Sequence, residues 1–426
     1  MTQTLAQLLS GELQGVKMLK ISENLTVFPR EILGLADTLE VLDLSGNQLS
    51  EIPKDASRLR KLKIAFFSNN NFTKVPDSFK ECENLYMLGF KANKIKTFDE
   101  DVLPLSVSWL ILTDNRIESL PSSMGKLAKL RKFAVAGNQL TTLPSAMANC
   151  ENLELIRLSA NKLREIPSWL LALPKLGWLA FSGNPCSIGE EVGILKVARK
   201  DMEILNLLGE GASGKIFKAY SKNLDMNVAL KLFKGAVTSD GYARDEMNSC
   251  VSASEHPNLI KVLAKIDEDG ELGLLLELIP SDFFNLGNPP DFESCTRDTF
   301  DDKSIFTLET ILAVAKAIAS ASTRLRSRNI SHGDLYARNI VLHPDKRCYL
   351  GDFGAASFYD GTNDGYEKIE VRAFGCLLED LLSYREVRDA KLYKVLDALR
   401  ANCVSENHKE RPFFKEIDCL LKEIIL

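Results

Sequence analysis

The chain has 426 residues, and its 53 lysine and arginine residues nearly balance its 58 aspartate and glutamate residues. A chain of this length exceeds what one hydrophobic core normally supports, so we expect two or more domains. The near-neutral balance, without a long run of one sign, excludes the charge signature of nucleic-acid or anionic-membrane binding, and neither is an expected partner.

The N-terminal stretch and the cysteines indicate a compartment. Residues 1–15 are polar and lack the basic start, apolar stretch and cleavage site of a secretory signal. No apolar run approaches the roughly 18 residues of a membrane span. The nine cysteines are scattered and never form a Cys-x-x-Cys pair, which disfavours a disulfide framework or a zinc site. We therefore expect a cytoplasmic protein.

Residues 16–186 contain a repeated leucine pattern whose units start 23 residues apart, with one spacing of 22. Leucines at the first, fourth, sixth and eleventh places predict a shared core, and an asparagine at the ninth place can satisfy backbone groups where each short strand ends. The pattern resembles the leucine-rich repeat family, which implies an α/β solenoid of eight repeats over residues 1–187 with strands lining a concave face. The starts and their asparagines are Val16 and Asn24, Leu39 and Asn47, Leu62 and Asn70, Leu85 and Asn93, Val107 and Asn115, Leu130 and Asn138, Leu153 and Asn161, and Leu176 and Asn184.

The third place of each repeat should point out of the concave face, and seven of these eight side chains are apolar. Large apolar patches usually mark interaction sites, and tryptophan is enriched at binding hot spots. We therefore expect this face to bind a protein, with Ile64, Phe66, Trp109 and Trp178 in the contact and the C-terminal half of the chain as one candidate occupant. The alternative is that these side chains pack against their neighbours and merely complete the solenoid.

Residues 188–202 are expected to form a short polar and helical connector.

After the connector, residues 203–220 (EILNLLGEGASGKIFKAY) place Gly209, Gly211 and Gly214 between two apolar runs that predict strands. Such a strand–turn–strand setting lets the backbone lie close over nucleotide phosphates, whereas the dinucleotide-binding version needs a helix directly afterwards. A further predicted strand ends in Lys231, which can reach phosphates as a point charge.

Two further motifs follow at the expected distance. Residues 331–340 read SHGDLYARNI, and residues 350–354 read LGDFG after a hairpin-like stretch. Together with the glycine turn and the lysine, in this order, they resemble the catalytic machinery of the protein-kinase superfamily. The whole layout is similar to that of soluble leucine-rich repeat protein kinases. The resemblance implies a two-lobed α+β domain over residues 203–426, with lobes at 203–279 and 280–426.

The resemblance also implies roles, with ATP and Mg²⁺ as cofactors. Asp334 would be the base or orienter for the attacking hydroxyl, while Asn339 and Asp352 would be the magnesium ligands. Glu246 is the expected helix partner of Lys231, with Asp245 as a rival. Residues 273–280 (GLLLELIP) resemble the strand and hinge that hold adenine, with Leu276 as gatekeeper and Glu277 and Ile279 at the nucleotide. His332 is expected to be structural.

Several departures from the family pattern concern regulation by phosphorylation and the binding of a peptide substrate. Gly333 replaces the arginine that, in many kinases, binds the phosphate group of a phosphorylated activation loop. Only 15 residues separate Gly354 from Glu370, and the Ala-Pro-Glu triplet that shapes the peptide-docking shelf is missing. Glu370 stands where the family has aspartate, and Arg411 lacks its usual glutamate partner. Peptide binding is therefore less firmly indicated than ATP binding.

The acceptor is left open by the catalytic loop. Tyr336 stands where serine/threonine kinases usually have a lysine, and Arg338 stands where many tyrosine kinases have an arginine. We expect serine or threonine, because these are the commonest acceptors in the family. One alternative is a small-molecule phosphotransferase, since the His-Gly-Asp-Leu motif also resembles aminoglycoside and choline phosphotransferases. Another is a repeat scaffold with a silent kinase domain.

Overall fold

The computed structural model describes residues 3–424 apart from 190–191, 212, 236–237, 239, 254, 269, 302–303 and 386–389. It divides into two compact units, Met1–Leu173 and Pro174–Leu426. The division falls inside the region expected to hold the repeats, which ends at residue 187 by sequence. The strand of the eighth repeat therefore groups with the C-terminal unit.

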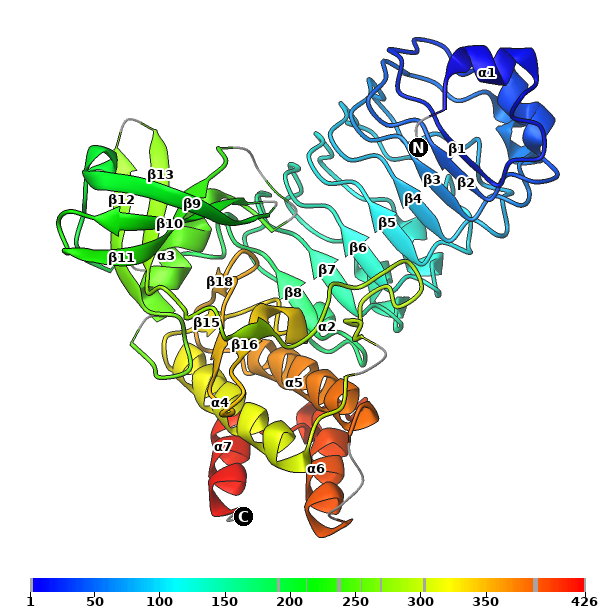
Figure 1. Cartoon of the computed structure of the whole chain (residues 1–426). Helices are drawn as coiled ribbons and strands as arrows, with labels where there is room; N and C mark the ends of the chain where they lie inside the picture. Colours follow the sequence, from blue (N-terminus) through cyan, green and yellow to red (C-terminus); the bar gives the residue numbers. More distant parts are fainter. Residues whose placement is uncertain are drawn as a thin grey trace. The chain divides into compact units, whose positions relative to one another are not determined.

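Each of the eight repeats contributes a three-residue strand that begins at its third place, as the leucine period predicts (Figure 1). From β1 to β7, neighbouring strands pair in parallel, and each residue lies opposite its equivalent one repeat later, as Met18 lies opposite Val41. The strands are β1 (Met18–Lys20), β2 (Val41–Asp43), β3 (Ile64–Phe66), β4 (Met87–Gly89), β5 (Trp109–Ile111), β6 (Lys132–Ala134), β7 (Leu155–Arg157) and β8 (Trp178–Ala180).

The repeat core is built from the leucine places and the asparagines. Leu39, Leu42, Leu44 and Leu49 of the second repeat are all fully buried. Asn47 of that repeat is also buried; its amide donates to the carbonyls of residues 21 and 44, and its oxygen accepts from the amides of residues 23 and 25. The asparagine thus satisfies backbone groups that no strand partner reaches, which confirms the expectation from its place.

The side of the repeats away from the strands is formed mainly by short 3₁₀ helices, each preceded by a proline as N-cap residue. Proline has a φ angle suited to helix initiation, and tight 3₁₀ turns use few residues, so they fit a repeat of this length. The helices of this unit are α1 (Leu5–Ser10), η1 (Arg30–Leu35), η2 (Lys54–Arg58), η3 (Ser122–Lys126), η4 (Ser145–Asn149) and α2 (Ser168–Leu171).

The apolar third-place side chains are less exposed than expected. Ile64, Met87 and Leu155 are buried, whereas Met18 is 54% exposed. Phe66 and Trp109 are partly exposed. Burial of these residues agrees with the alternative interpretation, in which they pack against neighbours. In the C-terminal unit, Trp178 is only 2% exposed, so it is not open to a second protein.

The first lobe of the C-terminal unit is an antiparallel sheet with one helix (Figure 1). Its strand order is β12-β13-β11-β10-β9, and α3 packs against β13. The elements are β9 (Met202–Glu210), β10 (Gly214–Ser221), β11 (Met226–Phe233), α3 (Ala243–Ala253), β12 (Val262–Glu268) and β13 (Glu271–Leu276). The connector before β9 was predicted to be helical, and this is wrong for its described part, which contains only a 3₁₀ turn, η5 (Arg199–Asp201).

The second lobe is mainly helical, with short strands around the catalytic loop. Helix α4 packs against α5 and α7, and α5 packs against α6. Strand β16 pairs with β14 and β17, and β15 pairs with β18. The elements are β14 (Phe284–Asn285), α4 (Leu308–Ser327), β15 (Ile330–Ser331), η6 (Ala337–Asn339), β16 (Ile340–Leu342), β17 (Cys348–Leu350), β18 (Ser357–Phe358), α5 (Gly365–Ser383), α6 (Ala390–Cys403), η7 (His408–Glu410) and α7 (Phe414–Glu423).

Of the helices in the described part of the chain, none combines the length and the apolar character that crossing a membrane requires.

The buried asparagines at the ninth place of the repeats lead to a prediction about stability. Asn115 is buried and donates to the carbonyls of Phe90 and Leu112, at 2.9 and 3.0 Å, while its oxygen accepts from the amide of Ile95. Asn115→Ala should lower the stability of the repeats by about 1–3 kcal/mol, because buried backbone groups lose their partner. Chemical unfolding followed by circular dichroism measures this. Asn84→Ala is the control, because Asn84 is exposed and should change stability by less than about 0.5 kcal/mol; equal effects would contradict the prediction.

Candidate active site

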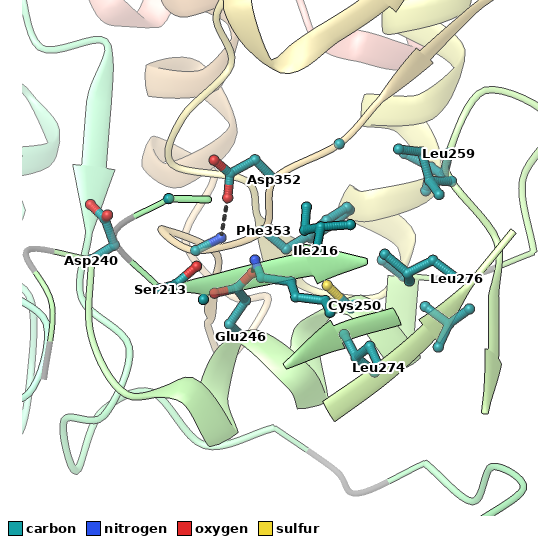
Figure 2. Close-up of a pocket in the computed structure, with 18 residues that line it drawn as sticks. Ser213, Ile216, Asp240, Glu246, Cys250, Leu259, Leu274, Leu276, Asp352 and Phe353 are labelled. Carbon is teal, nitrogen blue, oxygen red and sulfur yellow. Dashed lines mark hydrogen bonds and ion pairs between the residues drawn. The ribbon is translucent and has the colours of Figure 1, made fainter. Parts of the chain in front are cut away.

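A cavity of about 240 Å³ lies between the glycine turn, α3 and the Asp-Phe-Gly segment (Figure 2). Polar side chains gather at one end of it, among them Ser213, Glu246 and Asp352, while Leu274 and Leu276 line the other end. A pocket with an apolar floor and a few convergent polar groups is typical of a small-molecule site.

Lys231 and Glu246 form a buried ion pair at the polar end of the cavity. Strand β11 carries the lysine and α3 carries the glutamate. Burial lowers the pKa of Lys231, but the carboxylates of Glu246 and Asp352 more than offset this, so that its pKa is raised and the ammonium stays charged. Asp245, the rival partner, is half-buried and does not pair with the lysine; partial burial raises its pKa.

The three glycines of the turn differ in what they require. A Cβ at Gly214 would lie 2.3 Å from the carbonyl oxygen of Leu232, so the pairing of β10 with β11 needs a glycine there. At Gly209 and Gly211 a Cβ would meet nothing within 4 Å. The amide of Gly211 donates to the carbonyl of Gly214 at 2.9 Å and closes the turn. Gly211 and Gly214 line the cavity, and Gly209 lies outside its described lining.

The expected hinge directly follows β13. Leu276 ends this strand and lines the cavity, as expected of a gatekeeper. Glu277 and Ile279 lie outside the described lining of the cavity. The amide of Glu277 donates to the carbonyl of Lys261 at 2.9 Å, which ties the start of the hinge to the segment before β12.

A buried carboxylate holds the catalytic loop. Glu370 of α5 accepts hydrogen bonds from the amides of His332 and Gly333, both at 2.9 Å. Its burial raises its pKa, which the two amide donors and His332 oppose. His332 is itself fully buried; its Nδ1 accepts from the amide of Asp334 and its Nε2 donates to the carbonyl of Gly351 at 3.0 Å. The histidine is therefore structural and joins the catalytic loop to the Asp-Phe-Gly segment.

The same network places the remaining expected site residues. The amide of Asn339 donates through Nδ2 to the carbonyl of Asp334 at 2.8 Å, and the carbonyl of Asn339 accepts from the amide of Gly351. Asp352 follows directly, in the left-handed region with φ of 53°. Its carboxylate accepts from the amide of Gly354 at 3.3 Å and lines the cavity. Asp334, Asn339 and Asp352 thus belong to one hydrogen-bonded assembly.

Asp298 is a site residue that the sequence interpretation missed. Its carboxylate accepts from the amide of Arg338 at 2.7 Å and from the guanidinium of Arg338 at 3.1 Å. The same guanidinium lies 3.4 Å from Asp334. Asp298 therefore orients an arginine that reaches the expected catalytic aspartate. No local motif surrounds Asp298, and only the fold brings it 40 positions along the chain to Arg338.

The structure also accounts for Arg411, whose partner could not be assigned from sequence. It is 1% exposed and donates to the main-chain carbonyls of Ser405, Lys368 and Pro174, the last at 2.7 Å. Carbonyl oxygens take the place of a carboxylate. Burial, together with the nearby positive charge of Arg372, lowers the pKa of Arg411 to about 10.

Comparison with known proteins agrees with this geometry. A family model described as a protein kinase domain matches residues 202–374, and one described as a leucine rich repeat matches residues 37–95 and 106–163. This chain carries leucine-rich repeats followed by a protein kinase domain. The fold class expected from the sequence is therefore confirmed.

Among curated relatives, fibroblast growth factor receptor 1 of Xenopus laevis is 25% identical over 209 residues, covering 45% of this chain and 26% of the receptor. Fibroblast growth factor receptor 1 of Dugesia japonica is 29% identical, covering 46% and 24%. Tyrosine-protein kinase Abl of Drosophila melanogaster is 29% identical over 214 residues, covering 44% and 12%. The chain spans about a quarter of the two receptors and 12% of Abl.

The pKa of Asp298 generates a pH prediction for the kinase domain. Burial raises this pKa from 3.8 to about 6, although Arg338 favours the charged form. A raised carboxyl pKa means that the contribution of Asp298 to stability is complete below pH 4 and is lost as the pH rises through about 6. Between pH 4 and pH 7, the free energy of unfolding of the wild type should therefore fall relative to that of Asp298→Asn, which does not titrate. Chemical unfolding at each pH tests this, and parallel pH profiles would contradict it.

Proposed function

We propose that this protein transfers the γ-phosphoryl group of ATP to a hydroxyl of a protein. The observation that carries the proposal is that the buried Lys231–Glu246 pair and Asp352 line one cavity. Asn339 is hydrogen-bonded to the carbonyl of Asp334 and to the amide of Gly351, which precedes Asp352. Kinase activity requires the lysine–glutamate pair and the metal-binding aspartate to be in place together. The ion pair of Lys231 with Glu246 and the position of Asp352 at the same cavity support the proposal.

The residues at the site suit a magnesium nucleotide. Among the described residues, no group of three or more His, Cys, Asp or Glu side chains could hold a metal ion. Mg²⁺ usually takes one or two protein oxygens and completes its shell with phosphates and water. The carboxylate of Asp352 supplies one oxygen. Since Asn339 donates through Nδ2, its Oδ1 is the other candidate ligand. When bound, the ion neutralises charge on the phosphates.

Lys231 and Asp334 would then position the phosphates of ATP and the attacking hydroxyl. Lys231 keeps its charge in the buried pair and can hold the α- and β-phosphates. Asp334 is 7% exposed, and its main chain is anchored by Asn339 and His332, so its carboxylate is held to orient or accept the proton of the attacking hydroxyl. The guanidinium of Arg338 lies 3.4 Å from this carboxylate.

The comparisons favour a different phosphoryl acceptor from the one expected from the sequence. The sequence interpretation favoured serine or threonine, whereas one relative is named a tyrosine-protein kinase and another a tyrosine kinase receptor. Arg338, which stands where many tyrosine kinases have an arginine, is held in place by Asp298 and points to the catalytic aspartate. We infer that tyrosine is the acceptor.

A small-molecule alcohol is the second candidate acceptor. The short stretch between Gly354 and Glu370 leaves no room for the usual peptide shelf, which favours an acceptor that needs none. A silent scaffold is less well supported, because the lysine, both aspartates and the asparagine are present and connected. Recruitment of a protein by the partly exposed Phe66 and Trp109 of the repeats completes the proposal.

Asp334→Asn tests the reaction. It should lower the rate of phosphoryl transfer by about 10²–10⁴-fold, because the hydroxyl loses its proton acceptor, while ATP binding is retained. Radiolabelled ATP is supplied with Mg²⁺ to tyrosine peptides, serine and threonine peptides, and a panel of small alcohols. Label in tyrosine that the variant abolishes would support the proposal. Label in serine or threonine would overturn the acceptor assignment, and label only in small molecules would move the protein to the second candidate.

Asp352→Asn tests the metal site. Replacing a carboxylate ligand by an amide should raise the Mg²⁺ concentration needed for half-maximal turnover by about 10-fold or more. Turnover measured across a magnesium titration gives this value. Asp360→Asn is the control, because Asp360 is an exposed carboxylate of the same chain segment that caps the amide of Thr362. An unchanged magnesium requirement in Asp352→Asn would exclude it as a ligand.

A further inference from the structure

Residues 174–184, which end the seventh repeat and begin the eighth, pack on the kinase lobe within the C-terminal unit. We name this stretch the terminal repeat segment. It contains β8 and lies against α5, β18, the catalytic loop and the residues around the start of α3. The kinase domain lacks the usual loop between Gly354 and Glu370, and the contacts of the terminal repeat segment fall around that short stretch.

The catalytic loop receives the largest of these contacts. The ring of Trp178 stacks on Tyr336, with 4.6 Å between ring centroids and an angle of 4° between ring planes. Its Nε1 donates to the carbonyl of Leu335 at 3.2 Å. The two rings are 2% and 3% exposed. An aromatic pair of this kind, with a buried hydrogen bond, holds the residues that follow Asp334 in one position.

The close contact between β8 and the catalytic loop also explains the glycine of the His-Gly-Asp motif. Gly333 has φ of +72°, and a Cβ there would lie 2.6 Å from the carbonyl oxygen of Ala355 and 2.9 Å from that of Leu179. An arginine at this position would not fit beside β8. The chain has thus lost the receptor for a loop phosphate at the place where the repeat contacts the loop.

Helix α5 and strand β18 are held by main-chain groups of the segment. Arg411 and Arg372 donate to the carbonyls of residues 174 and 175, at 2.7 and 2.9 Å. The amide of Phe181 donates to the hydroxyl of Ser357 at 2.9 Å, and its ring stacks on Tyr366. Arg411 is the residue whose usual glutamate is missing. A carbonyl of the repeat supplies part of what that glutamate would give.

The last residues of the segment reach the start of α3. The hydroxyl of Ser182 donates to the carbonyl of Asp240 at 3.3 Å. A Cβ at Gly183 would lie 2.8 Å from the ring of Tyr242 and 2.9 Å from the carboxylate of Asp245. Asp245 immediately precedes Glu246, the partner of Lys231. The segment therefore connects the catalytic loop with the helix that carries the glutamate of the ion pair.

We propose that the terminal repeat segment takes the place of an activation segment, with Trp178 as the positioning residue that keeps the catalytic loop in its working arrangement, while Ser182 and Gly183 lie against the start of α3. The proposal rests on the proposed phosphoryl transfer and adds how that site is controlled. Activity needs no phosphate on the short loop, because a permanent part of the chain makes the connections that a phosphorylated loop makes elsewhere.

Trp178→Ala in the full chain is the test. Steady-state kinetics with radiolabelled ATP should show kcat lower by about 10- to 100-fold, with KM for ATP within about 2-fold, because the loop is displaced while the nucleotide pocket stays intact. Trp178→Phe keeps a stacking ring and should recover most of kcat. Trp169→Ala is the matched control, because it removes the same side chain from α2 in the other unit and should leave kcat unchanged.

Hydrogen exchange detected by mass spectrometry gives a readout that does not depend on turnover. Trp178→Ala should raise exchange in residues 331–339, whereas Trp169→Ala should not. If Trp178→Ala does not fold, Gly183→Ala serves instead; its Cβ would press on Tyr242 and Asp245, so exchange should rise in residues 243–253. Phosphatase treatment of the wild type should leave its kcat unchanged.

The outcomes separate the two proposals. Increased exchange in the variant with no phosphoryl transfer by the wild type would overturn the proposed function and support the positioning role. Unchanged exchange and unchanged kcat would overturn the positioning role. A higher kcat in Trp178→Ala would also overturn it, because the segment would then block the site, and so would loss of wild-type activity after phosphatase treatment.

Discussion

The hydrogen bonds from His332 and Gly333 to the buried carboxylate of Glu370 are the interaction on which the active site depends. A buried carboxylate is costly unless donors surround it, so the two amides and the helix must stay together. This contact fixes the main chain immediately before Asp334. His332 extends it to Gly351, next to Asp352. One carboxylate of α5, acting through His332 and Gly333, thus fixes the main chain next to both Asp334 and Asp352.

The surroundings of Glu370 show how the kinase domain tolerates its short loop. Arg372, two residues along α5, donates to the carbonyl of Lys175 at the end of the seventh repeat, and Arg411 donates to the carbonyl of Pro174. Both arginines are satisfied by main-chain oxygens, whose positions depend on the backbone of the repeat rather than on a side-chain rotamer. The repeat is therefore part of the fold of the C-terminal unit, which agrees with the division of the chain after Leu173.

Several features followed from local sequence because their causes are local. The strands of the repeats begin at the predicted third place, since a period of 23 residues brings equivalent positions into one core. The strands around the glycine turn and the hairpin of β16 and β17 also match, because turn residues and apolar alternation encode them over a few positions. Glu246 was the favoured partner of Lys231 with Asp245 as its rival, and the structure pairs the lysine with Glu246.

The sequence by itself determined the repeats, the kinase domain and the identity of the residues expected at its centre, because these depend on periodicity and on motifs a few residues long. Only the tertiary structure decided what surrounds them. Asp298 lies 40 positions from Arg338, and Trp178 lies 157 positions from the carbonyl it binds. Trp178 was expected on a docking face, but it is buried and packs against the kinase lobe. Contacts between residues so far apart depend on how whole elements pack, which no local pattern encodes.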